Sequence, residues 1–541
     1  MENPNAKPPR LIPLLSEAQS RLGYLSADAL RELSKKHTIP LHRLQELVSF
    51  YPHFRTTPPP RVELTVCRDM SCWLAGGEAC SRKLHELKSA DVEVHEVSCL
   101  GRCDQAPAAA VNGVPVPATN IERVKEWVAN PATVPSPRPN PPRRWAGDPY
   151  PTPEDRYATL NRGRSTRDFT QIGIKTLKES GLRGMGGAGF PAGTKGELVA
   201  KETRKPKYVI CNADESEPGT FKDREILADL PHLVIEGMAL AGLAIGSEKG
   251  ILYLRHEYGP EQIRFEAELR RAYDRGILGR TDANGWKFDI EVFVSPGGYI
   301  LGEETALLEA LEDKRGEPRN KPPFPGTHGL FGQPTLINNV ETLCMGTIIL
   351  ARGVDWWKSQ GAPGFAGLKF IAVSGHVTNP GVYLVPTGTT VRQLIEQAGG
   401  VKDGRQLLAF APGGASSNIL PSDKADVPLD FAALQNAGSM LGSGALVVIA
   451  EGTDLLALST NVVRFFRNES CGKCVPCRVG SHKAVEILEG VQAGTMPKSA
   501  LAVLPELGET LLQTSICGLG QVAVAPALSV LKAWPELGRE Q

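Results

Sequence analysis

The chain of 541 residues is too long for one hydrophobic core, and its 41% hydrophobic and 22% charged residues are typical of globular proteins. Lys plus Arg and Asp plus Glu both number 60, so no net field favours nucleic acid or an anionic membrane surface. The N-terminus lacks the apolar run and small-residue cleavage site of a secretory signal, and no apolar window is long enough to cross a bilayer. We therefore expect a cytoplasmic chain without direct membrane insertion, or a subunit of a larger assembly of that kind.

Taken in chain order, the residue patterns predict six regions. Apolar residues at three- and four-residue steps, with Ser26 as an N-cap, indicate short helices at the start. Further on, the strand-like segments KYVICN, GILYLR and FDIEVFVS alternate with helical ones around Glu225–Gly246 and Pro260–Tyr273, which favours a parallel sheet covered by helices. The predicted regions are helices over 1–57, a small β/α unit over 58–130, a proline-rich linker over 131–153, a larger α/β unit over 154–365, a β-rich unit over 366–450 and a helical unit over 451–541.

Eleven cysteines in a large chain without a secretory signal point to metal rather than to disulfides. Eight of them form two groups. The first, C-x4-C and then C-x3-C, comprises Cys67, Cys72, Cys99 and Cys103. The second, C-x2-C-x2-C with a fourth cysteine 40 positions later, comprises Cys471, Cys474, Cys477 and Cys517. We take Cys80, Cys211 and Cys344 as ordinary thiols.

Four thiolates hold either an iron–sulfur cluster or structural zinc. Zinc sites usually use two C-x-x-C knuckles, and neither cysteine group has that form. Three cysteines at three-residue steps with a distant fourth are more typical of a cubane cluster. The sequence therefore predicts a [2Fe–2S] cluster on the first group and a [4Fe–4S] cluster on the second.

The segment Gly181–Gly196 contains seven glycines in sixteen residues and one lysine, Lys195. Glycine lets the backbone approach a ligand closely, and free amide groups in such a loop can cradle a phosphate. The segment is neither a Walker sequence nor the usual dinucleotide fingerprint, because no strand directly precedes it. Alone it is a weak indication of nucleotide binding.

Two acidic segments strengthen that indication. The first follows the strand KYVI, so its polar side chains fall at the carboxyl edge of a sheet, where open α/β folds bind ligands. The second forms a turn that leads into a helix. Solvated loop charge and helix-dipole stabilisation could account for one such segment but hardly for both. The polar and glycine residues concerned are Asn212, Asp214, Glu215 and Glu217 in the first segment, and Gly297, Gly298, Glu303 and Glu304 in the second.

Five segments in this order resemble the flavin-bearing, NADH-oxidising subunit of respiratory complex I. They also resemble its relatives in NAD-dependent formate dehydrogenases and NAD-reducing hydrogenases. Residues 10–130, with CRDMSC and VSCLGRCDQAPAAAVNG, resemble the small thioredoxin-like [2Fe–2S] subunit, here fused to the larger one. The five segments are GLRGMGGAGFPAGTKG, CNADESEPGTFKDR, GGYILGEETALLEALEDKRGEPRNKPPFP, GQPTLINNVET and ESCGKCVPCRVG.

This resemblance implies a multidomain α/β fold: a thioredoxin-like [2Fe–2S] domain, a Rossmann-like FMN and NAD(H) domain, a β-grasp (SLBB) domain and a C-terminal helical bundle with the [4Fe–4S] cluster. It also implies roles for individual residues. Glu217, Tyr299 and Glu304 are expected to be catalytic. The residues expected at the cofactors are Gly184, Gly186, Gly187, Gly189, Lys195, Asn212, Asp214, Asn338 and Asn339 for FMN, and Phe190, Glu217, Glu303, Glu304, Lys321 and Phe324 around the nicotinamide cofactor and flavin edge.

The sequence departs from the family pattern at four positions without removing a cluster ligand or an expected cofactor contact. Met185 stands where arginine is usual, Ser216 where glycine is, Leu301 where cysteine is frequent, and Gly196 where an aromatic is common. Ser216 lies between two acidic residues, so we expect any effect on substrate affinity or oxygen reactivity to arise there.

The resemblance implies an NAD(H):FMN oxidoreductase that relays single electrons through the [4Fe–4S] cluster to a partner, as part of a hetero-oligomer. We expect a large iron–sulfur catalytic subunit, favouring that of a molybdenum or tungsten formate dehydrogenase. The diaphorase of a nickel–iron hydrogenase and complex I itself are the alternatives, and fusion disfavours complex I. A zinc-stabilised scaffold or NAD sensor without turnover is an alternative of a different class.

Overall fold

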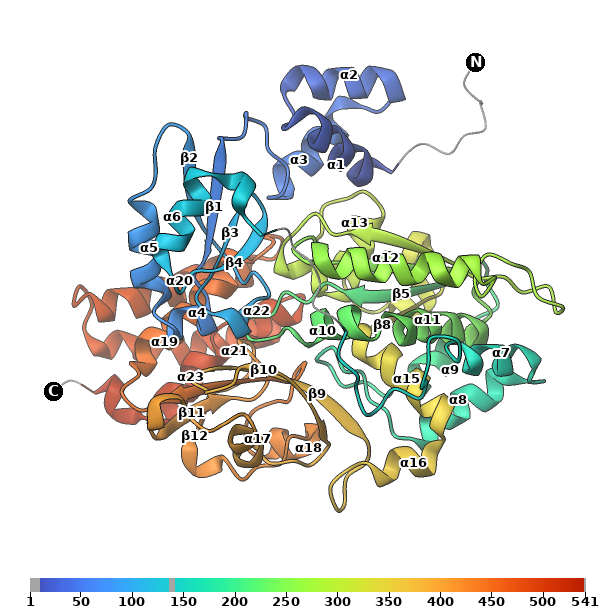
Figure 1. Ribbon diagram of the computed structural model, residues 1–541. Helices are drawn as coiled ribbons and strands as arrows, with labels where there is room; N and C mark the ends of the chain where they lie inside the picture. The colour runs from blue at the N-terminus through green and yellow to red at the C-terminus, as the bar shows by residue number, and fades with distance from the viewer. Residues whose placement is uncertain (1–9, 136–141, 540–541) are drawn as a thin grey trace.

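The computed structural model describes residues 10–135 and 142–539 (Figure 1). The start of the predicted helical region (1–9), part of the predicted linker (136–141) and the last two residues lie outside the described residues.

Three short helices open the described chain, as the sequence predicts: α1 (Leu11–Leu22), α2 (Ala27–His37) and α3 (Leu41–Phe50). The Ser26 hydroxyl accepts the Ala29 amide at 3.1 Å, which confirms the predicted N-cap. The helices pack against the larger α/β unit: the Tyr51 hydroxyl donates to the Lys314 carbonyl at 2.6 Å and the Ile12 amide to the Asp313 carboxylate at 2.9 Å.

A four-stranded sheet of order β2-β1-β3-β4 follows, with β1 and β2 parallel and the other pairs antiparallel. Its own apolar core includes Val62, Leu64 and Val66, which alternate along β1 and face one side of the sheet. The elements of this unit are β1 (Val62–Cys67), α4 (Met70–Leu74), α5 (Gly77–His85), β2 (Val92–Val97), η1 (Cys103–Gln105), β3 (Ala108–Val111), β4 (Val114–Pro117), α6 (Ile121–Ala129) and η2 (Pro131–Thr133).

The second half of the predicted linker packs against the rest of the protein. The Trp145 ring meets Phe370 edge-on with centroids 4.9 Å apart, and its indole N–H donates to Asp229 at 2.8 Å. Tyr150 is buried. Prolines dominate the composition of this segment, but its two aromatic side chains anchor it.

The larger unit contains four parallel strands in the order β7-β6-β5-β8. One long helix was expected around Glu225–Gly246, but the structure breaks it at Leu230 because Pro231 cannot continue the hydrogen-bond ladder. The elements are α7 (Ala158–Ser165), α8 (Phe169–Glu179), α9 (Ala192–Lys201), β5 (Tyr208–Ala213), α10 (Lys222–Asp229), α11 (Pro231–Ile245), β6 (Lys249–Leu254), α12 (Gly259–Asp274), β7 (Asp289–Val294), η3 (Tyr299–Gly302), α13 (Glu304–Leu311), α14 (Pro325–His328), η4 (Leu330–Gly332), β8 (Thr335–Asn339), α15 (Val340–Arg352) and α16 (Val354–Ser359).

A five-stranded sheet of order β10-β9-β13-β11-β12 comes next, and a helical bundle ends the chain. The sheet and its helices are β9 (Leu368–Gly375), β10 (Gly381–Pro386), α17 (Val391–Gln397), η5 (Lys402–Gly404), β11 (Leu407–Ala411), β12 (Leu420–Pro421), η6 (Ser422–Lys424), α18 (Phe431–Asn436) and β13 (Ala445–Ala450). The bundle comprises α19 (Leu455–Asn468), α20 (Val475–Gln492), η7 (Lys498–Val503), α21 (Leu504–Thr514), α22 (Gly518–Val522), α23 (Ala525–Ala533) and η8 (Pro535–Gly538).

Segments far apart in the chain share one core. Buried residues of α1–α3, of α13 and of the C-terminal helices belong to the same apolar cluster, and Met70 of the small unit joins it. In Figure 1 the blue β1–β4 sheet accordingly lies beside the red C-terminal helices. This packing brings both cysteine groups towards the edge of the central sheet.

No single helix among the described residues has the length and apolar character of a membrane span. One pair, Lys222–Asp229 with Pro231–Ile245, meets that test only when its two helices are taken together, and they are bent by 94°.

Candidate flavin, nucleotide and iron–sulfur sites

Polar side chains gather at the carboxyl edge of the parallel sheet. Asp214 follows β5, Arg255 follows β6 and Ser295 follows β7, while Asn339 ends β8. Asp214 accepts hydrogen bonds from Ser216 at 2.6 Å and Ser295 at 2.8 Å. Burial raises the pKa of Asp214, and these two hydroxyls oppose the rise. The edge is the ligand-binding position that a parallel sheet of this kind provides.

The glycine-rich loop lies between α8 and α9 and folds back on itself. An isolated bridge pairs Arg183 with Pro191, and the Gly184 amide donates to the Phe190 carbonyl at 2.8 Å. The amides of Gly186, Gly187 and Gly189 donate to no acceptor among residues 10–135 and 142–539. Gly187 has φ +130° and open space where a Cβ would be. These free amides form a cradle that suits a phosphate.

Asn339 lies directly beneath this loop, because a Cβ on Gly186 would come within 2.9 Å of the Asn339 Cβ. Its side-chain amide donates to Asp223 at 2.6 Å, and its oxygen caps α15 by accepting the Glu341 amide at 2.9 Å. Asn338 is the preceding residue of β8, and on the neighbouring strand Asn212 donates to the Gly302 carbonyl at 2.8 Å. All three asparagines predicted at the flavin therefore line one edge of the sheet.

Glu217 and Tyr299, both predicted to be catalytic, contact each other. The Tyr299 hydroxyl donates to the Glu217 carboxylate at 2.5 Å, and the Ser416 amide donates to the other oxygen at 2.6 Å. Burial raises the pKa of Glu217, against the effect of these two donors. Ser416 belongs to the β-rich unit and was not predicted. Its only signal in the sequence is the glycine pair Gly413–Gly414 that precedes it after a strand.

Glu304 lies between two lysines. Lys195 from α9 is 3.2 Å from one carboxylate oxygen, and Lys321 is 3.3 Å from the other. Lys321 also pairs with Glu303 at 3.0 Å, and Glu303 caps α13. Burial alone would raise the pKa of Glu304, but the two ammonium groups hold it below its ordinary value.

The two aromatic residues predicted around the nicotinamide cofactor are exposed, Phe190 by 48% and Phe324 by 59%. Phe190 precedes α9 and Phe324 precedes α14, and these helices pack together, since a Cβ on Gly326 would lie 3.5 Å from Val199. Exposed rings on adjacent elements are available to stack on a base.

The four residues that depart from the family pattern have different environments in the structure. Met185 and Leu301 are buried, Ser216 donates its hydroxyl to Asp214, and Gly196 lies on a buried turn of α9.

The first cysteine group is buried where the small unit meets the rest of the protein. The Cys99 and Cys103 sulfurs are 3.5 Å apart. Hydrogen bonds with Cys72 and Cys99 raise the pKa of Cys67, whereas those with Cys103 and Cys67 lower the pKa of Cys99. Each thiol thus contacts another of the set.

Two buried arginines tie the loop of this group to the central unit. Arg255 donates to the Cys99 carbonyl and, at 2.6 Å, to the Glu215 carbonyl. Arg224 donates to the Gly101 carbonyl at 2.6 Å and pairs with Asp104 at 2.8 Å. Sequence patterns did not single out either arginine.

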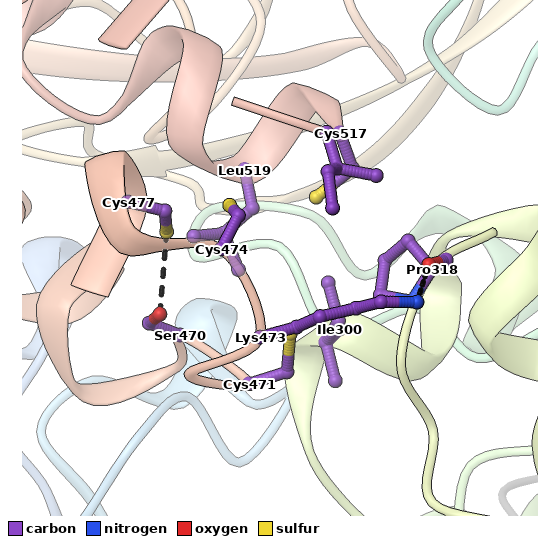
Figure 2. Close-up of a pocket in the computed structure, with 10 residues that line it drawn as sticks. Ile300, Pro318, Ser470, Cys471, Lys473, Cys474, Cys477, Cys517 and Leu519 are labelled. Atoms are coloured by element: carbon purple, nitrogen blue, oxygen red, sulfur yellow. Dashed lines mark hydrogen bonds between the residues drawn. The ribbon is translucent and has the colours of Figure 1, made fainter. Parts of the chain in front are cut away.

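The second cysteine group lines one pocket, together with Ile300 of η3 and Leu519 (Figure 2). The Ser470 hydroxyl lies 3.2 Å from the Cys477 sulfur, and Lys473 reaches out to the Pro318 carbonyl at 2.7 Å. Burial raises the pKa of Cys477 to about 11 and that of Cys517 to about 12. A bound cluster would be held by these cysteines as thiolates.

Both groups fit iron–sulfur clusters by the chemistry of their donors: the thiols of the first group interact with one another, and the four sulfurs of the second line one pocket. The free amides of the glycine-rich loop likewise fit a flavin phosphate. Within the described residues, no three or more histidine, cysteine or acidic side chains are grouped to hold a single metal ion.

Four family models match the chain. They are a "Nuo51 FMN-binding domain" over residues 177–345, a "Thioredoxin-like [2Fe-2S] ferredoxin" over 1–131, an "NADH-ubiquinone oxidoreductase-F iron-sulfur binding region" over 457–540 and an "SLBB domain" over 370–419. The predicted fold class and cofactors, FMN, [2Fe–2S] and [4Fe–4S] with NADH as substrate, are thereby confirmed.

Proteins of similar sequence and structure agree with these family models. The chain is 44% identical over 361 residues to an F-type subunit of NADH-quinone oxidoreductase from Rhizobium meliloti, covering 66% of this chain and 86% of that protein. It is 43% identical over 364 residues to the F-type subunit from Streptomyces coelicolor, covering 67% and 81%. The crystal structure of an air-oxidized NAD+-reducing [NiFe]-hydrogenase matches with a TM-score of 0.85 and 32% identity, covering 98% of this chain and 93% of that one. The chain therefore belongs to the family of the F-type subunits of NADH-quinone oxidoreductase, as an NAD-dependent flavin and iron–sulfur oxidoreductase with a thioredoxin-like [2Fe–2S] domain in the same polypeptide.

Proposed function

We propose that the chain exchanges hydride between NAD(H) and FMN and passes single electrons through the [4Fe–4S] cluster to a large catalytic subunit. The observation that carries this proposal is the convergence, at one sheet edge, of the free loop amides, the Glu217–Tyr299 pair and the Glu304–lysine cluster. Ile300 of η3 lines the pocket of the second cysteine group, and Tyr299 of the same turn is linked through Glu469 to Ser98, which precedes Cys99 of the first group.

FMN, when bound, supplies two-electron exchange with the nicotinamide and one-electron exchange with the clusters. The chain supplies orientation and electrostatics. Amides of Gly186 and Gly187 would hold the flavin phosphate, and the asparagines of β5 and β8 would hold the ring system. Glu304 and Glu217 would fix the nicotinamide end. Two lysines keep Glu304 ionised, and Tyr299 and Ser416 hold the Glu217 carboxylate in place.

The exposure of the two cysteine groups supports an exit through the C-terminal cluster. All four cysteines of the first group are buried, whereas Cys471, Cys474 and Cys517 are only partly buried. Beside them on α20, Val475 and Val479 are 58% and 55% exposed. Apolar side chains next to a cluster at the surface suit contact with a partner subunit. We therefore assign the [4Fe–4S] cluster as the exit and the [2Fe–2S] cluster as a side store.

The sequence favoured the catalytic subunit of a molybdenum or tungsten formate dehydrogenase as the partner. One observation favours the hydrogenase alternative: the match to the NAD+-reducing [NiFe]-hydrogenase extends over 98% of the chain, including the fused N-terminal unit. The matches to the quinone-linked subunits cover about two thirds of the chain. We therefore place a hydrogenase-type partner first and a formate dehydrogenase second.

The partner is tested by purifying the chain through an affinity tag from its native host under anaerobic conditions. Copurification of a nickel-containing subunit, with NAD+ reduced by H2, supports the hydrogenase. A molybdenum or tungsten subunit with NAD+ reduced by formate supports the second candidate. The FMN and iron content of the isolated chain is measured separately: colourless protein with zinc and no FMN would refute the redox function itself.

A further inference from the structure

Glu469 is the C-cap residue of α19 and lies between the two cysteine groups, two positions before Cys471. One of its carboxylate oxygens accepts the Ser98 hydroxyl, and the other accepts the Tyr299 amide at 2.9 Å. These partners come from the [2Fe–2S] loop and from η3, so one side chain joins three segments that are more than 160 residues apart in sequence.

Each of the two contacts leads directly to a functional group. Ser98 immediately precedes Cys99, whose sulfur lies 3.5 Å from that of Cys103. Tyr299 donates its hydroxyl to Glu217, and its ring packs edge-on against Phe465 of α19 with centroids 4.9 Å apart. Glu469 is therefore anchored on both sides, and its carboxylate is held towards the [2Fe–2S] loop.

The charge of Glu469 has no cationic counterpart. The ion pairs found among residues 10–135 and 142–539 do not include Glu469. By contrast, the arginines on the other side of the loop are each paired with carboxylates, Arg255 with Glu257 at 2.7 Å and Arg224 with Asp104 at 2.8 Å. Two further charged side chains lie at this loop: Asp69 accepts the Cys99 amide at 3.0 Å, and Arg68 donates to the Glu96 carbonyl, so Glu469 contributes one of several charges beside the loop.

A cluster gains one negative charge when it is reduced, so an unpaired carboxylate close to it disfavours the reduced state. We propose that Glu469 is a positioning residue that ties the [2Fe–2S] loop to the Tyr299 turn, and that its charge lowers the reduction potential of the [2Fe–2S] cluster. Through this charge, Glu469 limits how long an electron stays on the side store rather than on the exit cluster. This role rests on the proposed function.

The test uses E469Q in the full-length, cluster-loaded chain, with the midpoint potentials of both clusters measured by redox titration followed by electron paramagnetic resonance. Glutamine has the same shape, and its oxygen can still accept the Tyr299 amide, but it carries no charge. We expect E469Q to favour the reduced [2Fe–2S] cluster by up to about tenfold, which is about 59 mV for a one-electron couple. We expect a smaller shift at the [4Fe–4S] cluster.

Two further variants separate charge from structure. E489Q removes a carboxylate from α20 that is paired with Arg464 at 2.8 Å, and it should leave both potentials unchanged. E469D keeps the charge and should shift the [2Fe–2S] potential by less than a quarter of the E469Q value. E469Q with full iron content and an unchanged [2Fe–2S] potential would overturn the proposal.

If E469Q fails to hold the [2Fe–2S] cluster, E469D decides. A loaded E469D with the wild-type potential supports the charge role, whereas an equally empty E469D contradicts it. FMN content and NADH binding are measured in each variant. Loss of FMN and of NADH binding would count against the proposed function of the sheet edge. Unchanged cluster potentials would reject the tuning role, whether or not FMN and NADH still bind.

Discussion

Glu304 lies between the Lys195 and Lys321 ammonium groups, and this charge pattern keeps its carboxylate ionised despite partial burial. Opposite charges a few ångströms apart stabilise one another more strongly where water is partly excluded. A side chain held in this way can orient a bound nucleotide without being needed for the binding of FMN, whose predicted phosphate cradle lies on the glycine-rich loop.

We predict that E304Q lowers the rate of NADH oxidation with an artificial electron acceptor by about tenfold, equivalent to about 1.4 kcal/mol of transition-state free energy. The lost charge frees Lys195, leaves Lys321 paired with Glu303 alone, and loosens the nicotinamide end. FMN content, measured by fluorescence after denaturation, should remain stoichiometric. E312Q is the control, because Glu312 is also paired with basic side chains, Lys314 and Arg319, but lies outside the candidate site. Stoichiometric FMN loss in E304Q would count against the assigned role.

Glu236 is a second carboxylate whose environment sets its charge. It is fully buried in α11, accepts the Leu160 amide at 2.8 Å, and leaves its other oxygen without a hydrogen-bond partner among the described residues. Burial raises its pKa from 4.5 to about 7. The folded protein therefore binds a proton between pH 4.5 and 7 that the unfolded chain does not, so this residue costs stability as pH rises through that window, and the cost is complete above pH 7.

We predict that E236Q is more stable than the wild type at pH 8, by roughly 3 kcal/mol for a pKa shift of this size. The advantage should disappear between pH 7 and 5. Thermal unfolding followed by differential scanning fluorimetry across this range measures it. E248Q, at an exposed position just after the same helix, is the control. An equal Tm difference between E236Q and wild type at pH 5 and pH 8 would show that Glu236 is not titrating in this window.

At the scale of elements, the loop between β11 and β12 connects the SLBB unit to the nucleotide site. The Ser416 amide holds Glu217, the Ala415 amide donates to the Pro218 carbonyl at 3.2 Å, and Gly414 packs against both acceptor residues. This unit therefore completes the site from outside the parallel sheet.

We predict that G414A weakens NADH use several-fold while leaving FMN bound. Gly414 has φ +80°, and an added Cβ would lie 2.9 Å from the Pro218 carbonyl and 3.0 Å from the Glu217 Cγ. The change should raise the KM for NADH more than it lowers kcat. G400A is a matched control, because Gly400 lies in the same unit and has φ +82° with open space where a Cβ would be. This variant therefore adds backbone strain without a steric contact. Equal kinetic effects in both variants would assign the change to strain alone.

The elements that the sequence predicted are those with a strong local signal. KYVICN and GILYLR contain continuous apolar runs, FDIEVFVS alternates apolar with acidic residues before a short apolar run, and the three segments form β5, β6 and β7 as expected. The cysteine spacings predicted the two clusters, whereas FMN and NAD(H) were predicted from the resemblance of five segments to a known family. The contacts of Ser416, Arg255 and Glu469 could not be predicted, because each depends on how separate units pack, and no local pattern encodes that packing. Pro231 is itself a signal for the break between α10 and α11, but the prediction of one long helix did not take this proline into account.

At the scale of the whole molecule, the [2Fe–2S] unit is fastened by buried charges. Arg224 is almost fully buried and connects α10 to Asp104 and to the Gly101 carbonyl of the cluster loop. Paired and hydrogen-bonded in this way, it fixes where the cluster loop lies relative to the sheet edge. Glu215, with its pKa raised to about 7 chiefly by burial, caps the same helix by accepting the Asp223 and Arg224 amides.

We predict that R224M disconnects the [2Fe–2S] unit from the flavin without removing the flavin. Deleting one partner of a buried pair leaves Asp104 unpaired and costs about 3–5 kcal/mol. Electron transfer falls steeply when donor and acceptor no longer hold their separation, so in stopped-flow experiments NADH should reduce the [2Fe–2S] cluster more slowly. Reduction of the [4Fe–4S] cluster, which does not depend on this contact, should keep its rate. R392M, which breaks an exposed pair with Asp426 in the SLBB unit, is the control and should change neither rate. Equal slowing of both clusters in R224M would indicate damage to the flavin site, and unchanged rates would mean that the apolar interface alone holds the unit in place.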